Sequence, residues 1–227
     1  MSGTPASNRS DDYGLIETLR WTPDDGFIRL ALHLDRLCHS AAVLGFSGSR
    51  QQFLGALQAA AKDFPATPQR VRLLLEPPGR ITIDNQPLEL AERTGPIRYA
   101  FSSKTVNSHD PLLRHKTTRR ALFDNEHIRL HAATGCDEVL FINEKGELTE
   151  GSRTSLFVRS GGQLLTPPLS CGLLDGVLRR HLLQTRANVR ESVLYSHELA
   201  NADEVLLGNS LRGLQTAHPL TVPANSA

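Results

Sequence analysis

The chain has 227 residues, of which 39 % are hydrophobic, and its 25 basic and 24 acidic side chains leave a formal net charge of +1. This length allows a substantial buried core, and the balanced, scattered charges exclude the basic surface typical of proteins that bind nucleic acid or anionic membranes. No apolar run approaches the roughly 20 residues of a membrane span, and the polar start MSGTPASNRSDD lacks the apolar segment of a signal peptide, so we expect a cytoplasmic protein.

The first half of the chain predicts mixed helices and strands. Two β-prone runs, GLIETLRW and FIRLAL, flank the turn sequence TPDDG and predict a hairpin. Apolar residues at helical spacing then predict helices over about 33–46 and 50–62. Three further runs, RVRLLLE, RITID and IRYAFSS, are separated by Pro and Gly turns and predict strands.

The second half predicts another sheet with helices. A helix is expected over about 117–134, followed by strands at DEVLFIN, RTSLFVRS and QLLTP that are joined by turns. The segment CGLLDGVLRRHLL passes from a glycine-bounded loop into a helix, and EVLLGNS is a short buried strand.

These elements predict an α+β fold of two lobes. We expect a flexible N-terminus over 1–13, a small N-terminal lobe over 14–103, a linker over 104–110, and a larger, β-rich C-terminal lobe with helices over 111–227. Clefts between lobes commonly bind small molecules, so residues near the linker are candidates for a site.

Lys116 is the first candidate, because the chain holds 21 arginines and only four lysines, and this lysine stands in the arginine-rich segment LRHKTTRRAL. Arginine stays protonated in any protein site, whereas a desolvated lysine amine can lose its proton and act as a nucleophile. The three cysteines are far apart and lack the spacing of metal ligands, so we expect reduced thiols and no metal.

Four other features are individually weak. Glu150 in ELTEGS is either an ordinary turn glutamate or a carboxylate directed into a cleft. The helix that begins in LDGVLRR exposes the amides of Val177 and Leu178, which can bind a phosphate, although most helix starts bind nothing. Arg36 in HLDRL is typical of a solvated arginine, and Ser210 in GNSLRG is either part of a turn or an anion ligand.

Together these residues fit one cofactor, pyridoxal 5′-phosphate. It needs a lysine for its aldehyde, an anion beside its ring nitrogen, and several donors around a dianionic phosphate. The motifs ETLRW, HLDRL, LRHKTT, DEVLFINEKGELTEGSRTSLF, LLDGVLRR and GNSLRG occur in an order that resembles the class IV aminotransferase family, the fold-type IV pyridoxal-phosphate enzymes, over about residues 14–216.

The resemblance implies a role for each candidate. Lys116 would form the Schiff base with the cofactor, and Glu150 would pair with the pyridine nitrogen. The phosphate would be bound by Arg36, by the amides of Val177 and Leu178, and by Ser210.

Two further residues concern the substrate. Thr18 in ETLRW stands where some lyases of the family are thought to use a threonine for proton transfer, and Arg72 in RVRLLLE would meet a substrate carboxylate. The resemblance also implies a homodimer.

Three functions remain open from the sequence. HKTTRR with GNSLRG looks most like the aminodeoxychorismate lyases, which would make 4-aminobenzoate and pyruvate for folate synthesis. The alternative is an aminotransferase acting on branched-chain or D-amino acids. The third is a non-catalytic remnant, against which the joint presence of lysine, glutamate and arginine argues.

Overall fold

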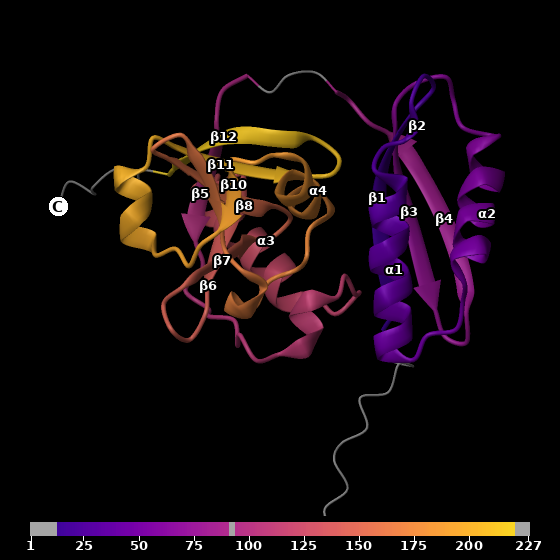
Figure 1. The fold of residues 1–227 in the computed structure, drawn as a ribbon, viewed down its shortest axis with the longest axis horizontal. Helices are drawn as coiled ribbons and strands as arrows, with labels where there is room; N and C mark the ends of the chain where they lie inside the picture. The colour runs from indigo at the N-terminus through magenta and orange to yellow at the C-terminus, as the bar shows by residue number, and fades with distance from the viewer. Residues whose placement is uncertain (1–12, 91–93, 221–227) are drawn as a thin grey trace, which may run out of the picture.

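The computed structural model describes residues 13–90 and 94–220. It has two lobes, each built on its own sheet, which lie side by side in Figure 1. The expected flexible N-terminus over 1–13 lies outside the described residues apart from Tyr13, which is buried against the small lobe.

The small lobe is a four-stranded sheet in the order β2-β1-β3-β4 with both helices on one face. Strand β3 (Gln69–Glu76) alternates buried and half-buried residues, because one of its faces packs on the core. In β1 the two faces are distinguished by their contacts: Leu15, Glu17 and Leu19 face the helices, so Ile16 and Thr18 face the other lobe. The elements are β1 (Leu15–Thr22), β2 (Gly26–Phe27), α1 (Leu30–Leu44), α2 (Arg50–Ala61), β3 (Gln69–Glu76) and β4 (Arg80–Pro87).

The predicted hairpin is only partly correct. FIRLAL was expected as a strand, but β2 ends at Phe27 and α1 begins at Leu30. Arg29 has φ 55°, in the left-handed region, and this turns the chain out of the sheet. Leu30, Leu34 and Leu37 then contact the core of the small lobe at helical spacing, which outweighs the strand propensity of the run.

The large lobe is an eight-stranded sheet in the order β10-β9-β8-β11-β12-β5-β6-β7. The sequence did not predict β12, in which a single residue, Ala217, is buried, and helix α3 begins at Ala121 rather than at residue 117. The elements are β5 (Ile97–Phe101), a 3-10 turn (Pro111–Arg114), α3 (Ala121–Thr134), β6 (Glu138–Ile142), β7 (Leu148–Gly151), β8 (Ser155–Ser160), β9 (Gln163–Thr166), α4 (Val177–Thr185), β10 (Val189–Glu191), β11 (Glu204–Asn209) and β12 (Gly213–Pro219).

The expected boundary between the lobes at residue 103 is wrong. Strand β5 was assigned to the small lobe, but it pairs in parallel with β6 and β12 of the large sheet. Its Ile97 and Tyr99 belong to the core of that lobe. The chain therefore crosses between the sheets after Pro87 and before Ile97, because the partners of a strand are set by long-range pairing and not by its neighbours in the sequence.

Two features are absent from the described residues. Within 13–90 and 94–220, no helix is both long and apolar enough to cross a membrane. The same part of the chain contains no group of three histidine, cysteine or acidic side chains arranged to bind a metal ion.

Candidate active site

A cavity of about 610 Å³ lies between the two lobes, and all eight candidate residues from the sequence line it. The small lobe contributes β1, β3 and α1, and the large lobe contributes the segment before α3, the end of β7, the start of α4 and the β11–β12 turn. The residues brought together are Thr18, Arg36, Arg72, Lys116, Glu150, Val177, Leu178 and Ser210.

Lys116 is placed by backbone hydrogen bonds to the edge of the small sheet. Its carbonyl accepts from the amide of Ile16 at 2.8 Å, and the amide of Thr118 donates to the carbonyl of Gly14 at 2.9 Å. Removal from solvent lowers the pKa of the Lys116 amine to about 7, and the positive charges of Arg120 and Arg36 act in the same direction. The amine can therefore lose its proton near neutral pH.

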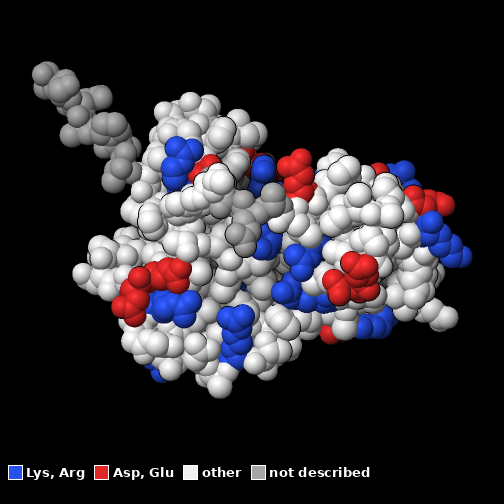
Figure 2. All heavy atoms as spheres, turned by 90° about the horizontal axis from the view of Figure 1, so that it is seen from above, with Lys and Arg blue, Asp and Glu red and all other residues white. Residues whose placement is uncertain are grey.

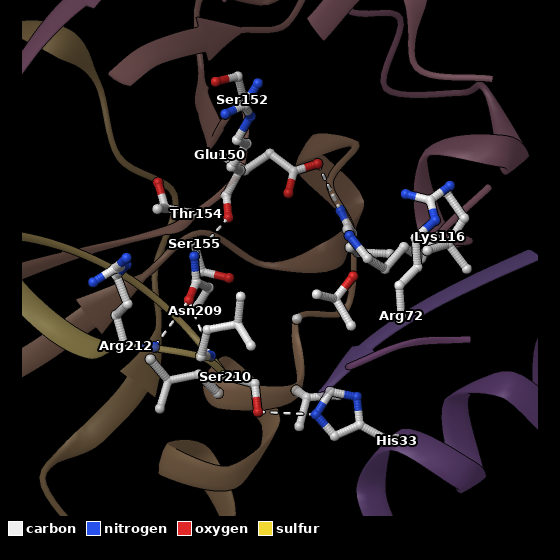
Figure 3. Close-up of a pocket in the computed structure, with 18 of the residues that line it drawn as sticks. His33, Arg72, Lys116, Glu150, Ser152, Thr154, Ser155, Asn209, Ser210 and Arg212 are labelled. Carbon is white, nitrogen blue, oxygen red and sulfur yellow. Dashed lines mark hydrogen bonds between the residues drawn. The ribbon is translucent and has the colours of Figure 1, made fainter. Parts of the chain in front are cut away.

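Glu150 is directed into the same cavity from β7 (Figure 3). Removal from solvent raises the pKa of its carboxyl to about 7, although the amide of Leu174, which donates to it at 2.9 Å, and the charges of Arg120 and Lys116 oppose the rise. A basic ring nitrogen or another cation beside this carboxyl would favour its ionised form.

The start of α4 forms the opposite end of the cavity. No side chain caps this helix, and the amides of Val177 and Leu178 stand at its first two positions, where a helix offers no internal acceptor. A Cβ added at Gly176 would lie 2.5 Å from the hydroxyl of Ser155, so the glycine allows the helix start to approach β8 closely. The helix start is suited to an anion.

Arg36 is not the solvated arginine that its motif alone suggested. It is 5 % exposed, and its guanidinium donates to both carboxylate oxygens of Glu17, at 2.8 and 2.7 Å. A third donor reaches the carbonyl of Asp175 in the large lobe at 3.1 Å. Because a guanidinium has five N–H groups, two remain for the cavity.

Two residues of the site were missed by the sequence analysis, Glu17 and His33. Glu17 is 2 % exposed, and Arg36 and His33 hold its pKa at about 2 against the opposing effect of burial. His33 joins Glu17 to Ser210, because one of its ring nitrogens is hydrogen-bonded to each of them. The available signal was a charged residue at a core-facing position of β1, between Leu15 and Leu19.

Basic side chains gather around the cavity (Figure 2). We use the term cationic mouth for the four arginines Arg70, Arg72, Arg153 and Arg212. Among the described residues, no acidic side chain forms an ion pair with any of them; Arg70 donates to the amide oxygen of Gln86, and Arg212 donates to the carbonyl of Glu89. The cavity therefore carries positive charge that the described part of the protein does not neutralise.

The fold has close relatives among solved structures. An amino-acid aminotransferase, provisionally described as such, from Mesorhizobium loti has a TM-score of 0.86 and 39 % identity, with 92 % of this chain and 100 % of that chain covered. A structure from Legionella pneumophila, provisionally described as a 4-amino-4-deoxychorismate lyase, has a TM-score of 0.78 and 25 % identity, with 92 % and 86 % covered.

Sequence comparison gives the same family. A protein of Schizosaccharomyces pombe, provisionally named aminodeoxychorismate lyase, is 29 % identical over 207 residues, or 89 % of this chain and 87 % of that protein. The model of the amino-transferase class IV family matches residues 14–218. The chain belongs to the class IV aminotransferase family. It is a pyridoxal-phosphate-dependent enzyme, either a lyase or an aminotransferase.

Proposed function

We propose that the cavity binds pyridoxal 5′-phosphate through the residues expected from the sequence. The support is the chemistry of the donor set: a lysine with a lowered pKa, a buried carboxyl, and an uncapped helix start lie in one cavity. Arg36, the amides of Val177 and Leu178, and Ser210 would bind the phosphate, Glu150 would pair with the ring nitrogen, and Lys116 would bond to the aldehyde. When bound, this group would withdraw electrons from a carbon whose proton has been removed.

Lys116 would move the proton in the reaction. An amine whose pKa is near 7 is divided between its two protonation states at neutral pH, so it can both accept and return a proton. Thr18 lines the same cavity from β1, and its hydroxyl would assist a transfer to the leaving group. Glu150 would stay ionised beside the protonated ring nitrogen. Because the pKa of Glu150 is raised when no partner is present, its ionised form would depend on that contact.

We further propose that the substrate is 4-amino-4-deoxychorismate. This molecule carries two carboxylates, and the observation that favours it is the cationic mouth, whose arginines have no acidic partner among the described residues. Lys116 would remove the proton from the ring carbon that bears the amine. The bond from the ring to the enolpyruvyl oxygen would break, the enolpyruvate would gain a proton to become pyruvate, and the aromatic product would be 4-aminobenzoate.

An aminotransferase is the second candidate. The solved relative with 39 % identity is described as an amino-acid aminotransferase, and a Thermotoga maritima protein with 26 % identity is provisionally named a branched-chain-amino-acid aminotransferase. In that case Lys116 would move the proton of Cα, and a 2-oxo acid would leave. The four arginines of the cationic mouth are poorly suited to an aliphatic side chain. The family membership and the assembled cavity argue against a non-catalytic remnant.

The decisive experiment is a substrate comparison. Purified protein with pyridoxal 5′-phosphate is given 4-amino-4-deoxychorismate while 4-aminobenzoate and pyruvate are measured, and a panel of L- and D-amino acids is tested in parallel for 2-oxo acids. We expect both lyase products in equal amounts and little transamination. Fast transamination without 4-aminobenzoate would replace the lyase by the second candidate.

Arg72→Gln tests the proposed substrate contact. We expect KM for 4-amino-4-deoxychorismate to rise by about 10- to 150-fold, the value of one hydrogen bond to a charged group, with a smaller effect on kcat. Arg80→Gln is the matched control, because Arg80 lies on the neighbouring strand β4 and does not line the cavity. Equal KM values in the two variants would remove Arg72 from the site.

The assembly is proposed on family resemblance, and the location is the expectation from the sequence. We propose a cytoplasmic homodimer, and sedimentation of the purified protein tests its oligomeric state.

A further inference from the structure

A buried chain of hydrogen bonds links the two lobes beside the proposed phosphate site. Nδ1 of His33 lies 2.6 Å from a carboxylate oxygen of Glu17. Nε2 lies 2.9 Å from the hydroxyl of Ser210, a contact that Figure 3 shows as a dashed line. The exposed fractions of Glu17, His33 and Ser210 are 2 %, 1 % and 7 %. None of the roles proposed above uses His33.

The position of each proton in the hydrogen bonds of Glu17, His33 and Ser210 can be assigned. Glu17 has a pKa of about 2, so it is ionised and only accepts, and Nδ1 of His33 must carry a proton. Burial lowers the pKa of His33 despite the contact with Glu17, so its ring is neutral above pH 7 and Nε2 is an acceptor. The hydroxyl of Ser210 therefore donates its proton to His33 and has none left for the cavity.

This arrangement conflicts with the binding of a phosphate dianion. A dianionic phosphate only accepts hydrogen bonds, so Ser210 can contact it well only if the serine hydroxyl donates to it. Ser210 is free to do so only when Nε2 of His33 carries a proton and donates to the serine oxygen. One additional proton on Nε2 reverses the hydrogen bond between His33 and Ser210, while Nδ1 of His33 still donates to Glu17.

We propose that His33 takes up a proton when a phosphate monoester occupies the cavity, so that His33, which is held by the Glu17 carboxylate, donates to Ser210 and the hydroxyl of Ser210 donates to the phosphate. The inference rests on the proposed cofactor, since it concerns the residues that would bind its phosphate.

The charged groups around His33 shift its pKa in opposite directions, so a bound ligand can change the protonation state of its ring. Glu17 on β1 favours the charged ring, whereas Arg36 on α1 and Lys116 before α3 oppose it. From the β11–β12 side, the contact is the neutral hydroxyl of Ser210, whose carbonyl accepts from Arg29 at 3.4 Å. A phosphate dianion would add negative charge beside this group and so raise the pKa of His33.

The experiment counts protons rather than turnover. Pyridoxamine 5′-phosphate is titrated calorimetrically into the protein at about pH 7.5, where its phosphate is a dianion, in two buffers that differ in ionisation enthalpy. This ligand carries an amine in place of the aldehyde, so it does not bond to Lys116. The difference in heat between the buffers gives the number of protons taken up on binding.

Two substitutions at His33 separate its two contacts. The amide of His33→Gln places a donor toward Ser210 but does not titrate, so we expect it to bind the ligand with close to one proton fewer than the parent. The shorter His33→Asn keeps the contact with Glu17 and loses the one with Ser210, and we expect its affinity to fall. The affinity of the parent should also decrease with pH more steeply than that of His33→Gln, by up to about tenfold per pH unit.

Serine variants test the same chain without removing the histidine. Ser210→Ala should reduce proton uptake, because His33 then has no link to the phosphate. Ser40→Ala is the matched control. The buried hydroxyl of Ser40 also contacts a histidine nitrogen, Nδ1 of His115 at 2.9 Å, but Ser40 does not line the cavity. The proton uptake of this variant should equal that of the parent. Equal proton uptake in the parent, His33→Gln and Ser210→Ala would overturn this inference alone, whereas no binding by the parent would overturn the proposed cofactor site as well.

Discussion

At the scale of single residues, the two groups that define the site are held in protonation states that cost stability. The folded protein lowers the pKa of Lys116 from 10.5 to about 7 and raises that of Glu150 from 4.5 to about 7. In both cases, removal from solvent disfavours the charged form. An enzyme that needs a proton carrier near neutral pH benefits from the same shift that weakens its fold.

The stability of Lys116→Met tests this cost. Between pH 7 and 10.5 the unfolded lysine holds a proton that the folded one has released, so the parent gains stability relative to the variant as pH rises through this range. Without cofactor, we therefore expect Lys116→Met to have a higher melting temperature than the parent at pH 7 and an almost equal one near pH 10.5, while its turnover is lost.

Differential scanning calorimetry across this pH range provides the measurement. Lys62→Met is the control, because Lys62 is exposed at the end of α2 and should show no such pH-dependent difference. A melting temperature of Lys116→Met below that of the parent at pH 7 would contradict the proposed electrostatic cost.

At the scale of elements, the start of α4 shows how a helix terminus is kept available for a ligand. Gly176 stands at the N-cap position with φ −62° and ψ 135°, and no side chain bonds to the first amides. Serine, threonine, aspartate or asparagine would usually fill this position and satisfy those amides internally. The uncapped terminus therefore costs the isolated helix some stability and leaves its amides for an anion.

Val177→Pro removes one of these amides without breaking the helix. Proline fits the first helical position, and the extended ψ of Gly176 is compatible with a following proline. We expect the affinity for pyridoxal 5′-phosphate to fall by about 10- to 150-fold, measured by fluorescence titration. Val177→Ala is the matched control, since it shortens the same side chain and keeps the amide. If the alanine variant loses as much affinity as the proline variant, then packing and not the amide explains the effect.

At the scale of the whole molecule, the cavity lies where one face of the small sheet meets turns of the large lobe, and both sides contribute arginines. The small lobe presents Arg70 and Arg72 from β3, and the large lobe presents Arg153 and Arg212. A concentration of one sign of charge in a cleft attracts ligands of the opposite sign and is screened by salt. The net charge of the whole chain, +1, gives no indication of this local field.

The field predicts a salt dependence of catalysis. We expect KM for 4-amino-4-deoxychorismate to rise several-fold as the ionic strength increases beyond about 0.1 M, where the screening length is roughly 10 Å, with little change in kcat. Steady-state rates at increasing sodium chloride concentration provide the measurement. Arg212→Gln should flatten the dependence, and a KM independent of salt in the parent would argue against recognition by the cationic mouth.

The sequence alone was sufficient for the family and for a set of candidate residues that the fold brings to one cavity. Ordered motifs identified Lys116, Glu150 and Arg36 because the chemistry of a site demands particular side chains at particular points of a chain, and all of them line one cavity. Helix and strand periodicity located most of the elements because it records which face of each is buried.

Only the tertiary structure decided which segments became partners. Strand β5 joined the large sheet, β12 formed although only Ala217 of its residues is buried, and Glu17 came to lie between Arg36 and His33. Each of these outcomes depends on contacts between residues far apart in the chain. Local propensity and spacing contain no information on such partners, because the free energy that selects them comes from packing, pairing and desolvation in the folded molecule.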